Sequence, residues 1–133
     1  MAITLINPDI VINSVDLTNH ITSVTFEESY ADVDTTAFGA TSKTRIAGLG
    51  DHKFSCEFQQ DFANGSVEQT IYPLVSTLVA VTVQQNPGSV TTSNPSYSFN
   101  VLVTEWSPVA GKVGDLQVAS VSWPISGSVT KTV

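Results

Sequence analysis

The chain has 133 residues, of which 41% are hydrophobic and only 13% are charged, about half of the ~25% charged share that is usual for globular domains. Its 12 acidic and 5 basic residues leave a net charge of −7, which argues against tight nucleic-acid binding because phosphate contacts need clustered lysines and arginines. The length suits a single domain over residues 1–133, and the one cysteine excludes an intrachain disulfide.

The first third of the chain has the pattern of short strands. Alternating apolar residues predict strands over residues 3–6 and 9–17, with a turn near Asn13. Residues 21–38 are the longest extended candidate. The apolar side chains of this segment change from one face to the other near residues 31–33, so we expect a bend or a β-bulge there.

The long polar segment over residues 39–51 is unusual for a hairpin connection, because most hairpin loops have two to five residues. We expect an arm that becomes ordered against a neighbouring subunit, and a flexible hairpin tip is the alternative. The candidate contact residues of the arm are Phe38, Lys43, Arg45, Ile46 and Leu49. The candidate acidic partner face consists of Glu27, Glu28, Asp32 and Asp34.

Residues 52–62 alternate cleanly in hydrophobicity and predict a half-buried strand. His52 and Cys56 lie four residues apart and therefore share a face of that strand, as an activated thiolate would require. However, Cys56 stands between Phe54 and Phe58 on the apolar face. This position favours a buried thiol in the core over a nucleophile.

A metal site could combine Asp51 and His52 with a carboxylate from Asp32 or Asp34. The sequence contains no Cys-x-x-Cys, His-x-x-x-His or calcium-loop spacing, so we expect no bound metal. It also lacks a Gly-x-Ser-x-Gly nucleophile motif and a phosphate-binding glycine loop, and we interpret His20 as a turn residue. We therefore predict no catalytic residue, no cofactor and no enzymatic activity.

One segment has helical rather than strand periodicity. Apolar residues over 66–78 follow the 3.6-residue period, which predicts a helix of about three turns. Ser66 and Gln69 form a capping-box pattern at its start. Pro73 should kink or shorten the helix, because proline lacks the N–H that an interior helical position needs.

The remaining chain returns to strand patterns. Strands are expected over residues 80–85, 97–108 and 115–133, separated by polar loops at 86–95 and 109–115. Many strands and one helix predict a mainly β fold, a β-sandwich or barrel with one flanking α-helix and a long inter-strand loop. The chain has neither a signal-peptide pattern nor an apolar run that could span a bilayer, which predicts a protein made in a cytoplasm with no membrane partner.

Four stretches together resemble the major tail proteins, or tail tube proteins, of long-tailed bacteriophages. Each stretch combines a strand or helix pattern with a short motif. The resemblance rests on the order and spacing of the four stretches along the chain more than on any one of them. They are the opening strands "INSVDLTNHITSVTFEESYADVDTTAFG", the loop and strand "TRIAGLGDHKFSCEFQQDF", the short helix "VEQTIYPLV" and the closing "SVSWPISGSVTK".

The resemblance implies a structural virion protein located in the tail and made in the host cytoplasm. Proteins of this family form hexameric rings that stack into a tube for the genome, and a long loop reaches to an adjacent subunit. The partners implied are other copies of the chain, tail proteins such as the tape measure and the terminator, and DNA as a weakly interacting cargo. The acidic residues Glu27, Glu28, Asp32 and Asp34 could then face the lumen instead of a partner.

Other virion proteins share such a β-rich core. A capsid decoration protein, a head–tail connector and a tail terminator are therefore the alternative functions. A low content of lysine and arginine fits the tube function, because DNA would form few phosphate contacts and could slide.

Overall fold

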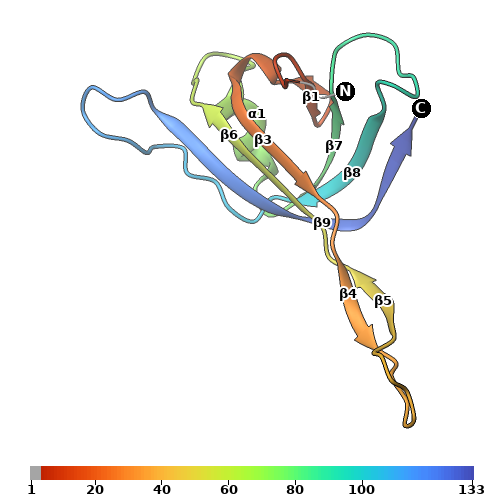
Figure 1. Ribbon diagram of the computed structural model, residues 1–133. Helices are drawn as coiled ribbons and strands as arrows, with labels where there is room; N and C mark the ends of the chain where they lie inside the picture. Colours follow the sequence, from red (N-terminus) through yellow and green to blue (C-terminus); the bar gives the residue numbers. More distant parts are fainter. Residues whose placement is uncertain (1–3) are drawn as a thin grey trace.

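The computed structural model describes residues 4–133, which form a curled sheet from which an arm projects (Figure 1). The strands of the sheet are β1 Asp9–Ile12, β2 Val15–Asp16, β3 Ile21–Glu27, β6 Lys53–Gln59, β7 Leu78–Gln84, β8 Ser96–Leu102 and β9 Val118–Thr132. The strands of the arm are β4 Tyr30–Asp34 and β5 Arg45–Gly50. The helical segments are α1 Val67–Ile71 and two 3-10 turns, Thr18–His20 and Tyr72–Leu74.

The seven strands of the sheet follow the order β2-β1-β7-β8-β9-β6-β3, and all neighbouring pairs are antiparallel. The sheet curls into an open half-barrel, with α1 beside β6 (Figure 1). The predicted mainly β fold with one flanking helix is confirmed in this form. One long edge of the sheet, β3, has no strand partner on its outer side within the described residues.

β9 joins the two halves of the sheet. Residues 118–124 pair with β6, and residues 125–132 pair with β8. Within the second segment the register with β8 shifts between Ser126 and Thr130, and Gly127 has a φ of +87°. A bulge of this kind bends a strand and increases its twist, so β9 can turn from one half of the sheet into the other.

Pro124 lies inside β9 without interrupting it. Ile125 donates its N–H to the His52 carbonyl on the β6 side at 2.9 Å. Because successive N–H groups of a strand point in opposite directions, the nitrogen of Pro124 faces away from β6, where β8 ends at Leu102. The missing N–H therefore does not affect the pairing with β6, and it falls where the pairing with β8 ends, a position at which proline is tolerated.

The inside of the curl is a core of aromatic and aliphatic side chains. The largest buried side chains are Trp123, Phe54, Phe58 and Phe99. The indole of Trp123 lies 6.2 Å from the ring of Phe54 and 6.3 Å from that of Phe58, measured between centroids. The predicted alternation of β6 is confirmed, since Cys56 is buried between its two phenylalanines.

The N-terminal predictions are confirmed only in part. Residues 4–6 of the predicted strand 3–6 are not in a strand, and residue 3 lies outside the described residues. The predicted strand and turn over residues 9–17 form the β1–β2 hairpin. Asn13 and Ser14 have φ values of 51° and 65°, as a two-residue type I′ turn requires.

The longest extended candidate, residues 21–38, is two strands rather than one. β3 ends at Glu27 and β4 begins at Tyr30, so the chain leaves the sheet and enters the arm between them. A register shift lies between Tyr30 and Asp32, next to the residues for which the change of face predicted a bend or bulge.

The helix is shorter than predicted. α1 has five residues, and the chain continues as a 3-10 turn that contains Pro73, which confirms the expected shortening. The predicted capping box is wrong. The Ser66 hydroxyl donates to Oδ2 of Asp61 at 2.9 Å, and Oε1 of Gln69 accepts from the N–H of Gly65 at 3.2 Å.

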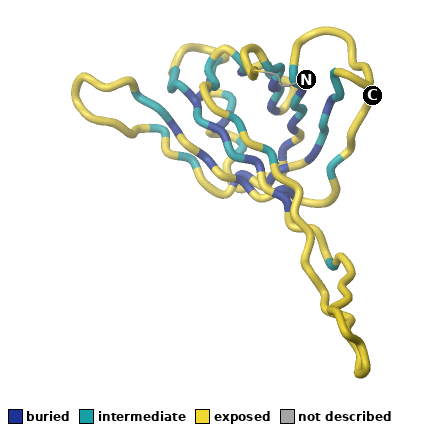
Figure 2. The backbone as a smooth tube through the Cα atoms, in the orientation of Figure 1, coloured by how far each residue is buried: buried dark blue, intermediate teal, exposed yellow. Residues whose placement is uncertain are grey.

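The predicted loop over residues 39–51 is wrong in its second half, because Arg45–Gly50 is strand β5. It pairs with β4, and the true connection between them covers residues 35–44. Figure 2 shows that almost the whole arm is exposed to solvent, whereas the buried residues lie in the body. The long loop is therefore the end of a longer, structured arm.

Candidate assembly interface

Short hydrogen bonds fix the root of the arm. The Asp51 N–H donates to the Ser29 carbonyl at 2.7 Å, and the Ser29 N–H donates to Nδ1 of His52 at 3.2 Å. His52 is only 4% exposed, and its ring lies edge-on to Tyr30 at 5.1 Å. A Cβ on Gly50 would lie 2.8 Å from two ring atoms of His52, so only glycine fits this position without a shift.

The two faces of the arm differ in chemistry. Val33 and Ile46 face each other across the strands, and Ala31 lies beside them. These side chains form an apolar face, yet Val33 is 42% and Ile46 59% exposed. Nothing of the described body covers this face, since β4 and β5 form a sheet with each other alone.

The opposite face of the arm is charged. Asp34 is the cross-strand partner of Arg45, and Asp32 that of Ala47. The Arg45 side chain reaches diagonally to Asp32, with 3.2 Å between Nε and Oδ2. Arg45 thus has an acidic partner within its own arm, which the sequence analysis had sought on a neighbouring subunit.

The connection at the tip of the arm is held by threonines. The Thr35 N–H donates to the Thr44 carbonyl at 2.9 Å, and the Thr44 N–H donates to the Thr36 hydroxyl at 2.9 Å. The Thr36 backbone N–H and hydroxyl lower the pKa of Asp34, chiefly through the backbone bond. The neck of the tip is therefore ordered by its own hydrogen bonds.

The predicted contact residues fall into two groups along the arm. Phe38 and Lys43 lie in the tip, and the Phe38 side chain is fully exposed. Arg45, Ile46 and Leu49 lie on β5, where Leu49 is also largely exposed. All five side chains thus lie on the arm and remain available for contact with another molecule.

The predicted acidic residues lie at two levels of the arm. Asp32 and Asp34 lie on the charged face of the arm. Glu27 ends β3, and Glu28 lies in the short connection to β4, so both are at the root. The structure therefore divides the predicted acidic face between two places.

Cys56 and His52 do not form a reactive pair. Cys56 is buried in the core, and burial raises the pKa of its thiol far above the usual range. Nδ1 of His52 accepts the Ser29 N–H instead. No group of three potential metal ligands is present among residues 4–133, and none of the helices described there is long and apolar enough to cross a membrane.

A serine–histidine–aspartate group that the sequence analysis missed lies beside α1. The Ser66 hydroxyl is 3.3 Å from Nε2 of His20, and it donates to Asp61 at 2.9 Å. In a catalytic triad the carboxylate holds the other ring nitrogen and the serine proton goes to histidine. Here Asp61 accepts from serine and lies 3.9 Å from the same ring nitrogen.

This group therefore links elements instead of activating a nucleophile. His20 ends a 3-10 turn, Asp61 follows β6 and Ser66 precedes α1. The Ala63 backbone N–H, and then the Ser66 hydroxyl, lower the pKa of Asp61. Sequence spacing could not reveal the group, because its members come from three elements that only the fold brings together.

Comparison with known proteins finds no matching family model and no matching curated protein. Solved structures do match. A chain in the virion of a native gene transfer agent (GTA) particle is 13% identical, with a TM-score of 0.69 over 94% of this chain and 96% of that chain. A chain in the tail of an empty GTA particle with C6 symmetry is 12% identical, with a TM-score of 0.60 over 86% of this chain and 83% of that chain.

A third match is more distant. A chain in the baseplate of the anti-feeding prophage (AFP), a six-fold symmetrised structure, is 7% identical, with a TM-score of 0.53 over 98% of this chain and 97% of that chain. At such low identities, the likeness establishes a common fold. The coverage of both chains means that this fold extends over nearly the whole of each.

Proposed function

We propose that the chain is a structural subunit of the tail of a phage-like particle. More specifically, we propose a tube subunit that assembles into hexameric rings, which stack around the passing DNA. Its partners would be other copies of itself and neighbouring tail proteins such as a tape measure and a terminator. The location would be the tail of the virion.

The observation that carries the proposal is the uncovered arm. An isolated two-stranded hairpin is marginally stable in water, and this one exposes the apolar pair Val33 and Ile46 together with Leu49. Exposed apolar groups gathered on one element are typical of a contact surface. A second copy of the chain is the simplest partner, because burial against it would stabilise the arm in every subunit of a repeating assembly.

The matched structures support the same conclusion. One matched chain belongs to a GTA tail with C6 symmetry, and another to a six-fold symmetrised baseplate. Six copies around an axis would also use the open edge of β3 and the two edges of the arm, since unpaired strand edges favour pairing with another chain.

The proposed function requires no catalysis. Cys56 is a core thiol, and the Ser66 hydroxyl donates to a carboxylate. A net charge of −7 would keep phosphate contacts few in the channel.

Sedimentation velocity tests the arm directly. The variant Val33→Ser with Ile46→Ser removes the apolar face of the arm and leaves the body unchanged. Because both side chains are exposed, the fold should persist within about 0.5 kcal/mol, while large assemblies disappear. The matched control is Leu78→Ser with Leu102→Ser, another exposed apolar pair that faces across two antiparallel strands.

The control should assemble like the wild type. Equal assembly of the arm variant and the wild type would contradict the role of the arm. The place of the protein in the particle is a separate question. Labelled protein found on heads instead of tails would favour a capsid decoration protein over a tube subunit.

A further inference from the structure

The loop formed by residues 109–116 is a second projection of the molecule. Hydrogen bonds hold the residues on both sides of this loop against the body. The indole Nε1 of Trp106 donates to the Glu68 carboxylate at 2.8 Å, and that of Trp123 donates to the Glu105 carbonyl at 2.9 Å. These two bonds tie the segment before the loop to α1 and to β9.

Both ends of the 109–116 loop meet at one carbonyl. The side-chain amides of Gln60 and Gln117 donate to the Pro108 oxygen at 2.8 and 2.9 Å. The residues that precede and follow the loop are therefore fixed together on the body. A loop presented from such a base needs little further ordering when it binds.

The loop itself is apolar and uncovered. Val113 is fully exposed, Val109 is 80% and Leu116 64% exposed. Lys112, one of only five basic residues in the chain, is next to Val113. The tip therefore combines an apolar side chain with a positive charge, and Asp115, whose N–H donates to the Lys112 carbonyl at 3.1 Å, adds a negative charge three residues further along.

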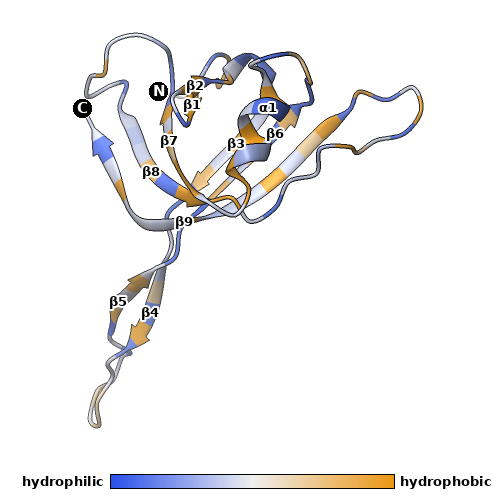
Figure 3. Cartoon of the chain, turned by 180° about the vertical axis from the view of Figure 1, so that it is seen from behind, coloured by the Kyte–Doolittle hydropathy of each residue, from blue (hydrophilic) through white to orange (hydrophobic). Residues whose placement is uncertain are grey.

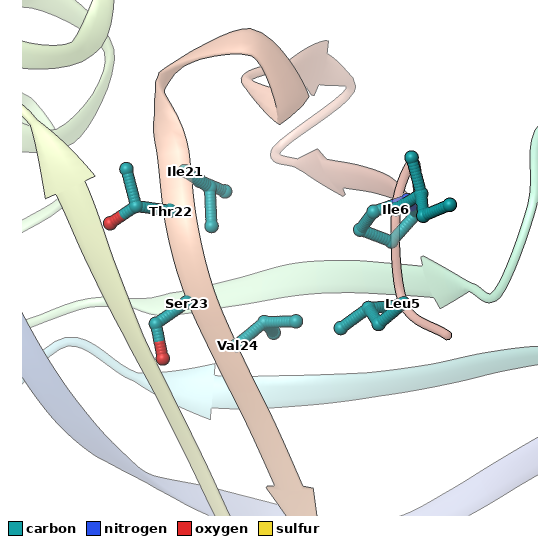
Figure 4. A pocket seen from close by; sticks show the side chains of 7 residues that line it. Leu5, Ile6, Ile21, Thr22, Ser23 and Val24 are labelled. Carbon is teal, nitrogen blue, oxygen red and sulfur yellow. The ribbon is translucent and has the colours of Figure 1, made fainter. Parts of the chain in front are cut away.

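A hollow with the complementary chemistry lies at the mouth of the half-barrel. The hollow, here named the terminal groove, has a volume of about 210 Å³, and its apolar lining comes from Leu5, Pro8, Val24, Phe26, Val83 and Tyr97. Figure 4 shows an adjoining hollow, where Leu5 and Ile6 lie opposite the start of β3. Apolar residues thus line the space between the N-terminal segment and β3, together with Thr22 and Ser23.

Negative charge lies directly beside the terminal groove. Pro8 lines the groove and also a third hollow, which is lined in addition by Asp9 and Asp16, and the Asp16 carboxylate accepts hydrogen bonds from Thr18. An apolar hollow next to two carboxylates matches a tip that carries Val113 next to Lys112. Such complementarity of charge fixes the register of a contact.

We propose that the 109–116 loop of one copy inserts Val113 into the terminal groove of the next copy, with Lys112 beside Asp9. The proposal rests on the self-assembly proposed above and adds the contact between neighbours within a ring.

The position of the two surfaces fits a head-to-tail contact. In Figures 1 and 3 the 109–116 loop lies at one side of the molecule, whereas β1 and the C-terminal end of β9 lie toward the other side. A contact between two different surfaces of identical chains repeats from copy to copy and forms a ring when the rotation closes. The arm leaves the body in another direction and remains free to contact a different copy.

Cysteine cross-linking tests the contact on the full chain. Val113→Cys with Gln85→Cys places one thiol on the loop and one in the lining of the terminal groove; the native Cys56 is buried. Mild oxidation should give covalent multimers larger than dimers, because each copy would bind the next. Val113→Cys alone should not form this series of covalent multimers. A second double variant, Phe38→Cys with Gln85→Cys, tests whether the arm occupies the terminal groove instead.

The outcomes separate this contact from the proposed function. Tubes that form without a cross-link between the cysteines at positions 113 and 85 would overturn the loop contact alone. Covalent multimers from the variant with cysteines at positions 38 and 85 would do the same. Cross-linked multimers without tubes would support the loop contact and contradict the tube. If the protein neither assembles nor forms the cross-link, both the loop contact and the tube function would be overturned.

A charge exchange provides a second readout. Lys112→Glu should weaken association by about tenfold, because like charges would meet at the acidic hollow. Adding Asp9→Lys should restore association, since the two charges would again be opposite. Loss in the single variant without recovery in the double variant would contradict the pairing of Lys112 with Asp9.

Discussion

At the scale of single residues, His52 connects the arm to the body. Nδ1 of the ring accepts the Ser29 N–H, and the edge-on contact of the ring with Tyr30 adds packing. The buried imidazole thus reinforces the root of the arm beside the bond from the Asp51 N–H to the Ser29 carbonyl.

The variant His52→Phe tests this connection. It keeps an aromatic ring beside Tyr30 but leaves the Ser29 N–H without its partner, which should cost about 1–3 kcal/mol. Amide exchange should accelerate at Ser29 and along β4, while exchange in β9 stays slow. His20→Phe is the control, because His20 lies away from the arm; unchanged exchange at Ser29 in His52→Phe would contradict the account.

Asp61 predicts a dependence of stability on pH. Hydrogen bonds from the Ala63 N–H and the Ser66 hydroxyl lower the pKa of the folded carboxyl below its usual value of 3.8. The stabilisation is therefore present above the unfolded pKa and is lost as the pH falls through the folded pKa. Asp61→Asn should reduce stability at pH 7 and have a smaller effect near pH 3.

Denaturant unfolding at both pH values measures this effect. Asp115→Asn, a change at an exposed carboxylate, provides the control. An equal cost of Asp61→Asn at pH 7 and at pH 3 would show that the charge of Asp61 does not matter.

At the scale of elements, the sequence predicted best where side chains alternate against a core. β6 was predicted with its buried Phe54, Cys56 and Phe58, because burial on one face imposes a period of two. β5 was missed. Its sequence, Arg45–Gly50, contains two glycines, which disfavour strands, and it packs on no core, so no alternation marks it.

The site was predictable to a similar extent. Charge and length pointed to an arm around Lys43 and Arg45, and apolar residues without a place in the core pointed to contact with another molecule. The pairing of Arg45 with Asp32 within one arm was not predictable, because it depends on the register of two strands. The Ser66 group depended in the same way on elements that are distant in sequence.

The packing of the arm gives a prediction at this scale. A Cβ on Gly48 would lie 3.0 Å from side-chain atoms of both Ala31 and Val33. Gly48→Val should therefore disturb the apolar face, although valine favours strands in general. Ala47→Val, one position away on the charged face, should be tolerated.

Hydrogen exchange distinguishes the two variants. In Gly48→Val the amides of β4 and β5 should lose protection while those of β6 and β9 keep it. Assembly should fall with the arm. Equal protection and assembly in the Gly48 and Ala47 variants would contradict the assigned register.

At the scale of the whole molecule, the body is a half-barrel with a buried core. Two projections of it expose apolar side chains that no other part of the described chain covers. The arm and the 109–116 loop expose apolar side chains in different directions (Figure 3). A neutral polar surface and a low charge content suit a chain surrounded by copies of itself. The fold, the exposed apolar surfaces and the low charge content thus all support the proposal that the chain is a subunit of an assembly.

The net charge predicts weak interaction with DNA. With a charge of −7 per chain, the assembled protein should not bind duplex DNA measurably even at low salt, where phosphate contacts are strongest. Fluorescence anisotropy of labelled DNA at about 50 mM salt measures this. Tight, salt-sensitive binding would contradict a channel in which DNA slides freely.

The most direct test of the central claim is electron microscopy of the purified wild-type protein. We expect rings with six-fold symmetry that stack into tubes at high protein concentration. A protein that remains monomeric at every concentration, with neither rings nor tubes in the images, would contradict this claim.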